Sequence, residues 1–198
     1  MMLLKLFFTL AALTILTAGR PTAQQLKRDE PSSEAVINAI NTWRNDAEKI
    51  NRFLNAFVTT GSLNFFDIAG PLNGAKDEVN QLATLKALGK TDLGDKGQSA
   101  ADQLALSINN ELKVRRKLEE IRDRTEEAGH GPESRAIDII RERCCHVIPF
   151  LGDLWTSAAT VSGVIPDVDV TVDLDPTFCS ATIPDSITPL VPAGCVGV

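Results

Sequence analysis

Histidine and aromatic residues are scarce in this sequence. The chain has no tyrosine and only two histidines in 198 residues. Catalysis by nucleophiles or general bases most often depends on a histidine with a partner. His130 lies in a glycine-rich turn and His146 follows a cysteine pair, and the sequence shows no partner for either. With 5% aromatic residues, the chain also lacks a platform for stacking sugars. We therefore predict no catalytic residues and no enzyme, the remote alternative being a secreted hydrolase.

The sequence has fewer basic residues than acidic ones. Lysine and arginine total 20 against 26 acidic residues, which gives a formal net charge of −6. Proteins that bind nucleic acids or anionic membranes neutralise phosphates with lysine and arginine, so neither partner is expected. Residues 113–127 are densely charged, but acids and bases alternate there at spacings of four residues. This stretch predicts a solvated helix with ion pairs along its surface rather than a basic recognition helix.

Long apolar runs are almost absent, and the exception lies near the first residue. The run 6–16 follows Lys5, precedes small residues, and is shorter than the roughly 20 residues that span a bilayer. This pattern predicts an export signal over residues 1–19. Residues 20–28 then resemble a propeptide that ends in a dibasic pair. We expect a secreted or cell-wall-associated protein whose mature chain has no transmembrane span.

Four cysteines in an exported chain predict two disulfides. Cys144 and Cys145 are adjacent in a helical stretch, whereas Cys179 and Cys195 lie in a proline-rich tail. Neighbouring cysteines diverge on a helix, so each is expected to reach into the tail. Two pairings stay open: Cys144–Cys179 with Cys145–Cys195, or Cys144–Cys195 with Cys145–Cys179. A zinc site would need spaced rather than adjacent cysteines, so no metal or cofactor is predicted.

Apolar residues recur at intervals of three and four along most of the chain, which predicts amphipathic helices. We expect an all-α fold, roughly a four-helix bundle, over residues 29–164. A disulfide-tied, mostly irregular tail is expected over residues 165–198. Residues 167–175 alternate between apolar and acidic side chains and predict one extended strand, whose acidic face we interpret as solvated rather than calcium-binding. The helices are predicted at 32–60, 71–88, 99–128 and 132–161, with a surface loop at 89–98 and a kink or stop at Pro149.

Two apolar segments suggest a ligand site inside the bundle. Helical bundles build such sites from side chains on facing helices. We predict a secreted, non-enzymatic protein that binds a lipid, held in an apolar cavity, or a hydrophobic or host surface. The alternative is an ordinary filled core in a structural or wall-associated protein. The predicted lining residues are Phe53, Phe57, Phe65 and Phe66 from one segment and Phe150, Leu154 and Trp155 from the other.

The overall plan of export signal, dibasic site, amphipathic helices and few cysteines resembles small secreted proteins of filamentous fungi. Residues 36–118 are similar in periodicity to the hydrophobic-surface-binding and cell-wall mannoprotein group. That resemblance implies a helical, secreted protein that binds lipids or hydrophobic surfaces. The cysteine pair departs from the pattern of that group, so no binding residue is carried over. The similar positions are Ile40, Ile50 and Leu54, then Leu72, Val79 and Leu82, then Leu104, Ile108 and Leu112.

Overall fold

The protein is all-α within the part of the chain that its computed structural model describes, as the sequence predicts. The predicted signal segment, residues 1–19, and the propeptide-like residues 20–28 lie outside that part, as does most of the tail. None of the helices described is both long and apolar enough to span a membrane. The structure describes residues 30–109, 114–124, 131–165, 167–170 and 177–180.

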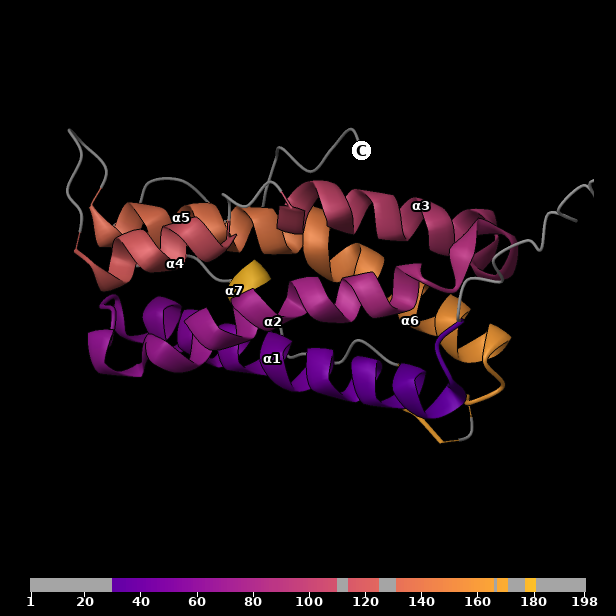
Figure 1. Ribbon diagram of the computed structural model, residues 1–198. Helices are drawn as coiled ribbons and strands as arrows, with labels where there is room; N and C mark the ends of the chain where they lie inside the picture. Colours follow the sequence, from indigo (N-terminus) through magenta and orange to yellow (C-terminus); the bar gives the residue numbers. More distant parts are fainter. Residues whose placement is uncertain (1–29, 110–113, 125–130, 166, 171–176, 181–198) are drawn as a thin grey trace, which may run out of the picture.

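The first helix, α1 (Ser33–Thr60), runs the length of the molecule (Figure 1). The side chain of Ser32 caps it by accepting a hydrogen bond from the backbone N–H of Ala35 at 3.2 Å. The helix ends at Gly61, whose left-handed backbone (φ 70°) lets its N–H bond to the carbonyl of Phe57. Both ends confirm the sequence prediction.

The second helix lies along the first. The short 3₁₀ turn η1 (Phe65–Asp67) reverses the chain, and α2 (Ala69–Lys86) packs against α1 (Figure 1). The predicted second helix is thereby confirmed, although it begins and ends two residues earlier than expected.

The third helix, α3 (Gly89–Asn109), corrects one prediction. Residues 89–98 were expected to form a surface loop because they hold three glycines. They are instead helical except at Gly94, where φ is 68° and the backbone kinks. Burial explains the difference: a Cβ atom added to Gly97 would lie only 2.5 Å from the Cβ atom of Ser157 in the last long helix. Close packing outweighs the weak helix propensity of glycine.

The predicted helix 99–128 corresponds to two helices in the structure. They are α3 and α4 (Val114–Arg122), on either side of residues 110–113, which are outside the described ranges. The apolar side chains of α4 are buried, and its charged face carries the expected ion pairs. These pairs are Arg115–Glu119 at 3.1 Å and Arg116–Glu120 at 2.8 Å.

A continuous helical rod follows. It consists of α5 (Pro132–Glu142), a π-helical segment η2 (Arg143–Val147) and α6 (Ile148–Val161). The chain therefore does not stop at Pro149, which occupies the first turn of α6, where its missing N–H costs little. The π segment widens the preceding turn, so that the first N–H of α6 bonds to the carbonyl of Arg143, five residues back.

The tail is attached to this rod by a disulfide. Cys144 and Cys179 are bonded, with Cα atoms 5.7 Å apart, which confirms one pairing of the two that the sequence left open. Cys145 is disulfide-bonded too, and Cys195 lies outside the described residues, so the pairing of these two stays a prediction. The short helix α7 (Thr177–Ser180) thus packs against α1 and α5.

Two contacts seat the tail segment. The hydroxyl of Thr177 and the N–H of Phe178 donate to the side-chain oxygen of Asn55 at 2.7 and 3.0 Å, and Phe178 is fully buried. The predicted strand is wrong over residues 167–170. The N–H groups of Asp167 and Val168 instead bond back to the carbonyl of Val164 at 2.9 and 3.1 Å, which forms a turn, and residues 169 and 170 have no regular structure. Residues 171–176 are not described.

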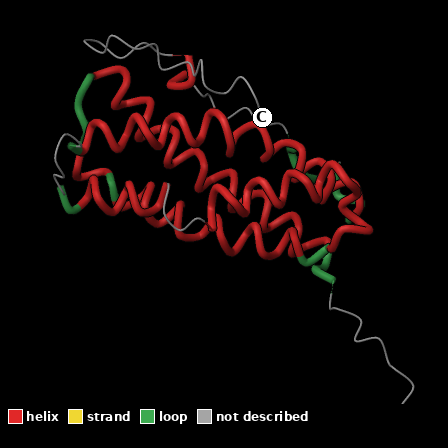
Figure 2. Tube along the Cα trace, turned by 90° about the horizontal axis from the view of Figure 1, so that it is seen from above, coloured by secondary structure: helices red, strands yellow, loops and turns green. Residues whose placement is uncertain are grey.

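The core is divided into two apolar clusters at opposite ends of the molecule. The tryptophan cluster, around Trp43 and Trp155, lies among α1, α2, α3 and α6. The phenylalanine cluster, around Phe53, Phe57 and Phe178, lies mainly among α1, α2, α4, α5 and α7. Figure 2 shows that the described part of the chain is almost entirely helical, with only short loops among the described residues.

Candidate functional site

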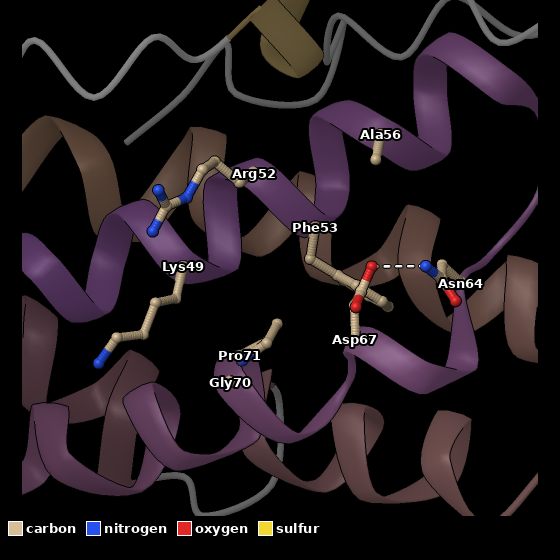
Figure 3. Close-up of a pocket in the computed structure, with 8 residues that line it drawn as sticks. All are labelled: Lys49, Arg52, Phe53, Ala56, Asn64, Asp67, Gly70 and Pro71. Carbon is tan, nitrogen blue, oxygen red and sulfur yellow. Dashed lines mark hydrogen bonds between the residues drawn. The ribbon is translucent and has the colours of Figure 1, made fainter.

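A groove opens on the surface between α1 and the beginning of α2. Its volume is about 270 Å³, and it lies where the 3₁₀ turn η1 swings the chain away from α1 before α2 returns along it (Figure 3). Three elements therefore supply its walls. The lining residues are Lys49, Arg52, Phe53 and Ala56 of α1, Asn64 and Asp67 of the turn, and Gly70 and Pro71 of α2.

The middle of the groove is apolar. Phe53 is largely buried and lies at the edge of the phenylalanine cluster, so that its ring closes the groove from the core side. Pro71, also buried, faces it from the first turn of α2, and Ala56 and Gly70 add little bulk. The groove is open because small residues stand where larger side chains would fill it. An aliphatic chain placed there would exchange water for carbon contacts.

The two ends of the groove differ in charge. Figure 3 shows Lys49 and Arg52 at one end and Asn64 and Asp67 at the other. The amide of Asn64 donates to the carboxylate of Asp67, which fixes the acidic end. Arg52 is exposed and makes no ion pair within the described residues. The groove is therefore dipolar, with an available cation at one end.

Lys49 has a second role beyond the groove. Its ammonium lies 2.7 Å from the carboxylate of Asp46, one turn earlier on α1. Asp46 is only 4% exposed, and one of its oxygens has no hydrogen-bond partner in the described structure. Gly74 explains this burial: a Cβ atom there would lie 3.0 Å from the carbonyl of Asp46, so glycine lets α2 approach closely. Burial raises the pKa of Asp46, Lys49 opposes the rise, and the nearby carboxylate of Asp77 adds to it.

A buried polar layer separates the two apolar clusters, next to this site. The guanidinium of Arg143, in the π-helical segment, has no exposed surface and lies 3.3 Å from the carboxylate of Glu78. Its Nε atom donates to the side chain of Asn51 at 3.2 Å. Burial raises the pKa of Glu78, and Arg143 opposes the rise. Because no substrate can reach these groups, we interpret the layer as part of the scaffold.

The predicted lining residues fall into separate places. Phe53 lines the groove, Phe57 is buried behind it and Phe65 packs partly against the same cluster, whereas Phe66 is 94% exposed. The second segment lies in the tryptophan cluster, so the structure does not bring the two segments together. The second segment consists of Phe150, Leu154 and Trp155. Leu154 and Trp155 have no solvent-accessible surface, so no void large enough for a water molecule lies against either side chain.

Sequence reasoning missed the polar residues of the groove. Lys49 and Arg52 fall off the apolar stripe of α1, where charged residues normally face solvent, so nothing in the pattern distinguishes them. Asn64 and Asp67 lie in a stretch whose structure the sequence left ambiguous. The signal that could have found the turn is the pair itself, since Asn64 caps η1 through its side chain.

Comparisons with known proteins do not assign the chain to a family. Among the described residues, no three histidine, cysteine or acidic side chains gather to hold a metal ion. The chain matches no protein-family model, and neither the curated proteins nor the solved structures contain a significant match to it.

Proposed function

We propose that this is a secreted, non-enzymatic protein that binds the hydrocarbon chain of a single-chain amphiphile, such as a fatty acyl lipid. The observation that carries the proposal is the groove between α1 and α2, with an apolar middle bounded by Phe53 and Pro71. Secretion is supported by the export pattern of the sequence and by the disulfide between Cys144 and Cys179.

The dimensions favour a slender ligand. Pockets for small molecules usually measure about 300 to 1,000 Å³, so a groove of about 270 Å³ lies near the lower limit. It suits part of one aliphatic chain better than a fused-ring sterol. Its opening to solvent leaves room for a headgroup outside.

A structural role without a ligand is the second candidate. It is favoured by the filled interior at the other end, where the rings of Trp43 and Trp155 meet edge to face at 6.2 Å with no exposed surface. The two candidates differ in one measurable property, which is saturable binding of an alkyl chain.

Isothermal titration calorimetry with decyl maltoside, below its micelle concentration, tests the proposal because this probe has a chain but no charge. We expect saturable binding to the secreted protein, weakened at least about tenfold by Ala56→Trp, since the indole would fill the groove. Ala83→Trp is the matched control, because Ala83 is exposed on α2 and does not line the groove. Absence of saturable binding, or equal binding by both variants, would favour the structural role.

A further inference from the structure

We propose that the groove prefers amphiphiles with an anionic headgroup, and that Asp46 makes this preference depend on acidity by holding Lys49 in an ion pair until the carboxylate is protonated. This inference rests on the proposed function of the groove. It adds the class of headgroup and the regulation of the same site.

The first step is that one ammonium group serves two partners. Lys49 lines the groove, and its Nζ atom lies 2.7 Å from the Asp46 carboxylate. The lysine side chain is 42% exposed, so an incoming headgroup can reach it from solvent. The Asp46 side chain is buried beneath it. While this ion pair is intact, part of the positive charge at this end of the groove is neutralised.

The second step is the direction in which an amphiphile would lie. Arg52 shares the end of the groove with Lys49 and has no ion pair in the described part of the chain, whereas Asp67 occupies the opposite end (Figure 3). A negative headgroup is attracted to the first end and repelled by the second. The hydrocarbon chain then lies over Phe53 and Pro71. The charges thus orient the ligand as well as select it.

The third step concerns the charges around Asp46. Lys49 faces Asp46 from α1. From α2, the carboxylate of Asp77 raises the pKa of Asp46, and Asp46 in turn raises the pKa of Glu78. Arg143 of the π-helical segment pairs with Glu78 at 3.3 Å. Burial and the Asp77 carboxylate both raise the pKa of Asp46, whereas hydrogen bonds from α2 side chains lower the pKa of Asp77. On acidification Asp46 is therefore protonated before Asp77.

The consequence is a gain of anion affinity in acid. Protonated Asp46 no longer balances the Lys49 ammonium, which becomes available to a sulfate, phosphate or carboxylate headgroup together with Arg52. A headgroup that stays ionised in acid should bind more tightly as pH falls, and an uncharged headgroup should not respond. Asp46 acts through Lys49 and is a positioning residue rather than a ligand-binding one.

The test compares decyl sulfate, which stays anionic in acid, with decyl maltoside by calorimetry on the secreted protein between about pH 4 and 7. We expect the affinity for decyl sulfate to rise about threefold to tenfold as pH falls, with no comparable change for decyl maltoside. Asp46→Asn should bind decyl sulfate tightly at every pH, without the rise. Lys49→Gln should lose the pH dependence and weaken the preference for sulfate over maltoside, which Arg52 then supports alone.

Asp102→Asn is the matched control. Asp102 also pairs with a lysine, Lys86 at 3.0 Å, and its loss changes the net charge equally, but neither residue lines the groove. This variant should keep the pH response of the wild type. If Asp102→Asn and Asp46→Asn behave alike, the response is one of overall charge and the inference is wrong. Circular dichroism shows whether each variant folds, and Lys49→Gln carries the test if Asp46→Asn does not.

The outcomes also separate this inference from the proposed function. Binding of both probes without any pH response for decyl sulfate would overturn the role of Asp46 and leave chain binding intact. No saturable binding of either probe would overturn both.

Discussion

The buried ion pair between Glu78 and Arg143 yields a prediction with an unusual pH signature. Glu78→Gln leaves the guanidinium buried without its counter-charge, and arginine cannot lose its proton in a protein. Arg143→Met instead leaves Glu78 without a partner, but a carboxylate can take up a proton. Arg143→Met should cost about 3 to 5 kcal/mol of unfolding free energy at neutral pH, because it leaves an almost fully buried carboxylate without its counter-charge. Glu78→Gln should cost much less, because glutamine resembles the protonated form of Glu78, which burial already favours.

The stabilities of the two variants should respond differently to acid. In Arg143→Met, the loss of the guanidinium raises the folded-state pKa of Glu78 further above its unfolded value. Stability is then regained as pH falls through the folded pKa towards the unfolded one, and lost as pH rises. In Glu78→Gln the side chain is uncharged at every pH, as it is in the wild type once Glu78 is protonated, so these two proteins should be about equally stable in acid. At neutral pH the double variant should be less destabilised than Arg143→Met alone, because no buried charge is then left without a partner.

Urea unfolding followed by far-ultraviolet circular dichroism measures these free energies. Asp153→Asn is the control, because it breaks the surface pair with Lys96 at 2.8 Å and should cost less than about 1 kcal/mol. A cost below about 1 kcal/mol for Arg143→Met at neutral pH, or one that does not shrink in acid, would refute the claim that a dry ionic layer divides the core.

Three further predictions concern stability. Burial raises the pKa of Asp46, so the stability linked to this carboxyl group is present at low pH and lost as pH rises through the folded pKa. Asp46→Asn should therefore stabilise the protein at neutral pH and give no gain in acid, which urea unfolding at both pH values measures. Gly97→Ala should destabilise by about 1 to 3 kcal/mol in the same assay, since its Cβ would lie 2.5 Å from Ser157, and an unchanged midpoint would contradict this contact. Replacing Cys144 and Cys179 together by serine should cost up to about 4 kcal/mol, because that bridge closes a separation of 35 residues, and a loss near zero would show that it contributes little.

Local signals made much of the fold predictable. Ser32 and Gly61 bound the first helix through hydrogen bonds within one turn of chain, and such signals are written in short stretches of sequence. Glycine-rich residues 89–98 were misread because their helix is stabilised by contact with a distant segment at Ser157. The choice of Cys179 as the partner of Cys144 likewise depends on tertiary docking of α7.

The candidate site was less predictable than the fold. Phe53 was predicted as a lining residue, but its polar neighbours in the groove look like ordinary solvated charges until α2 is placed beside α1. The polar layer was missed for the same reason. Arg143 meets Asn51 and Glu78 across separations of 92 and 65 residues, and a hydrophobic periodicity carries no information about such a meeting.

Nuclear magnetic resonance tests the central claim, that an alkyl chain binds between α1 and α2, most directly. In a titration of the ¹⁵N-labelled protein with decyl maltoside, we predict saturable amide shifts confined to residues 49–56 and 64–70, where the groove lies. The indole N–H signals of Trp43 and Trp155, buried in the other cluster, should not move. Shifts centred on those two indoles, or no saturable shift anywhere, would contradict the account.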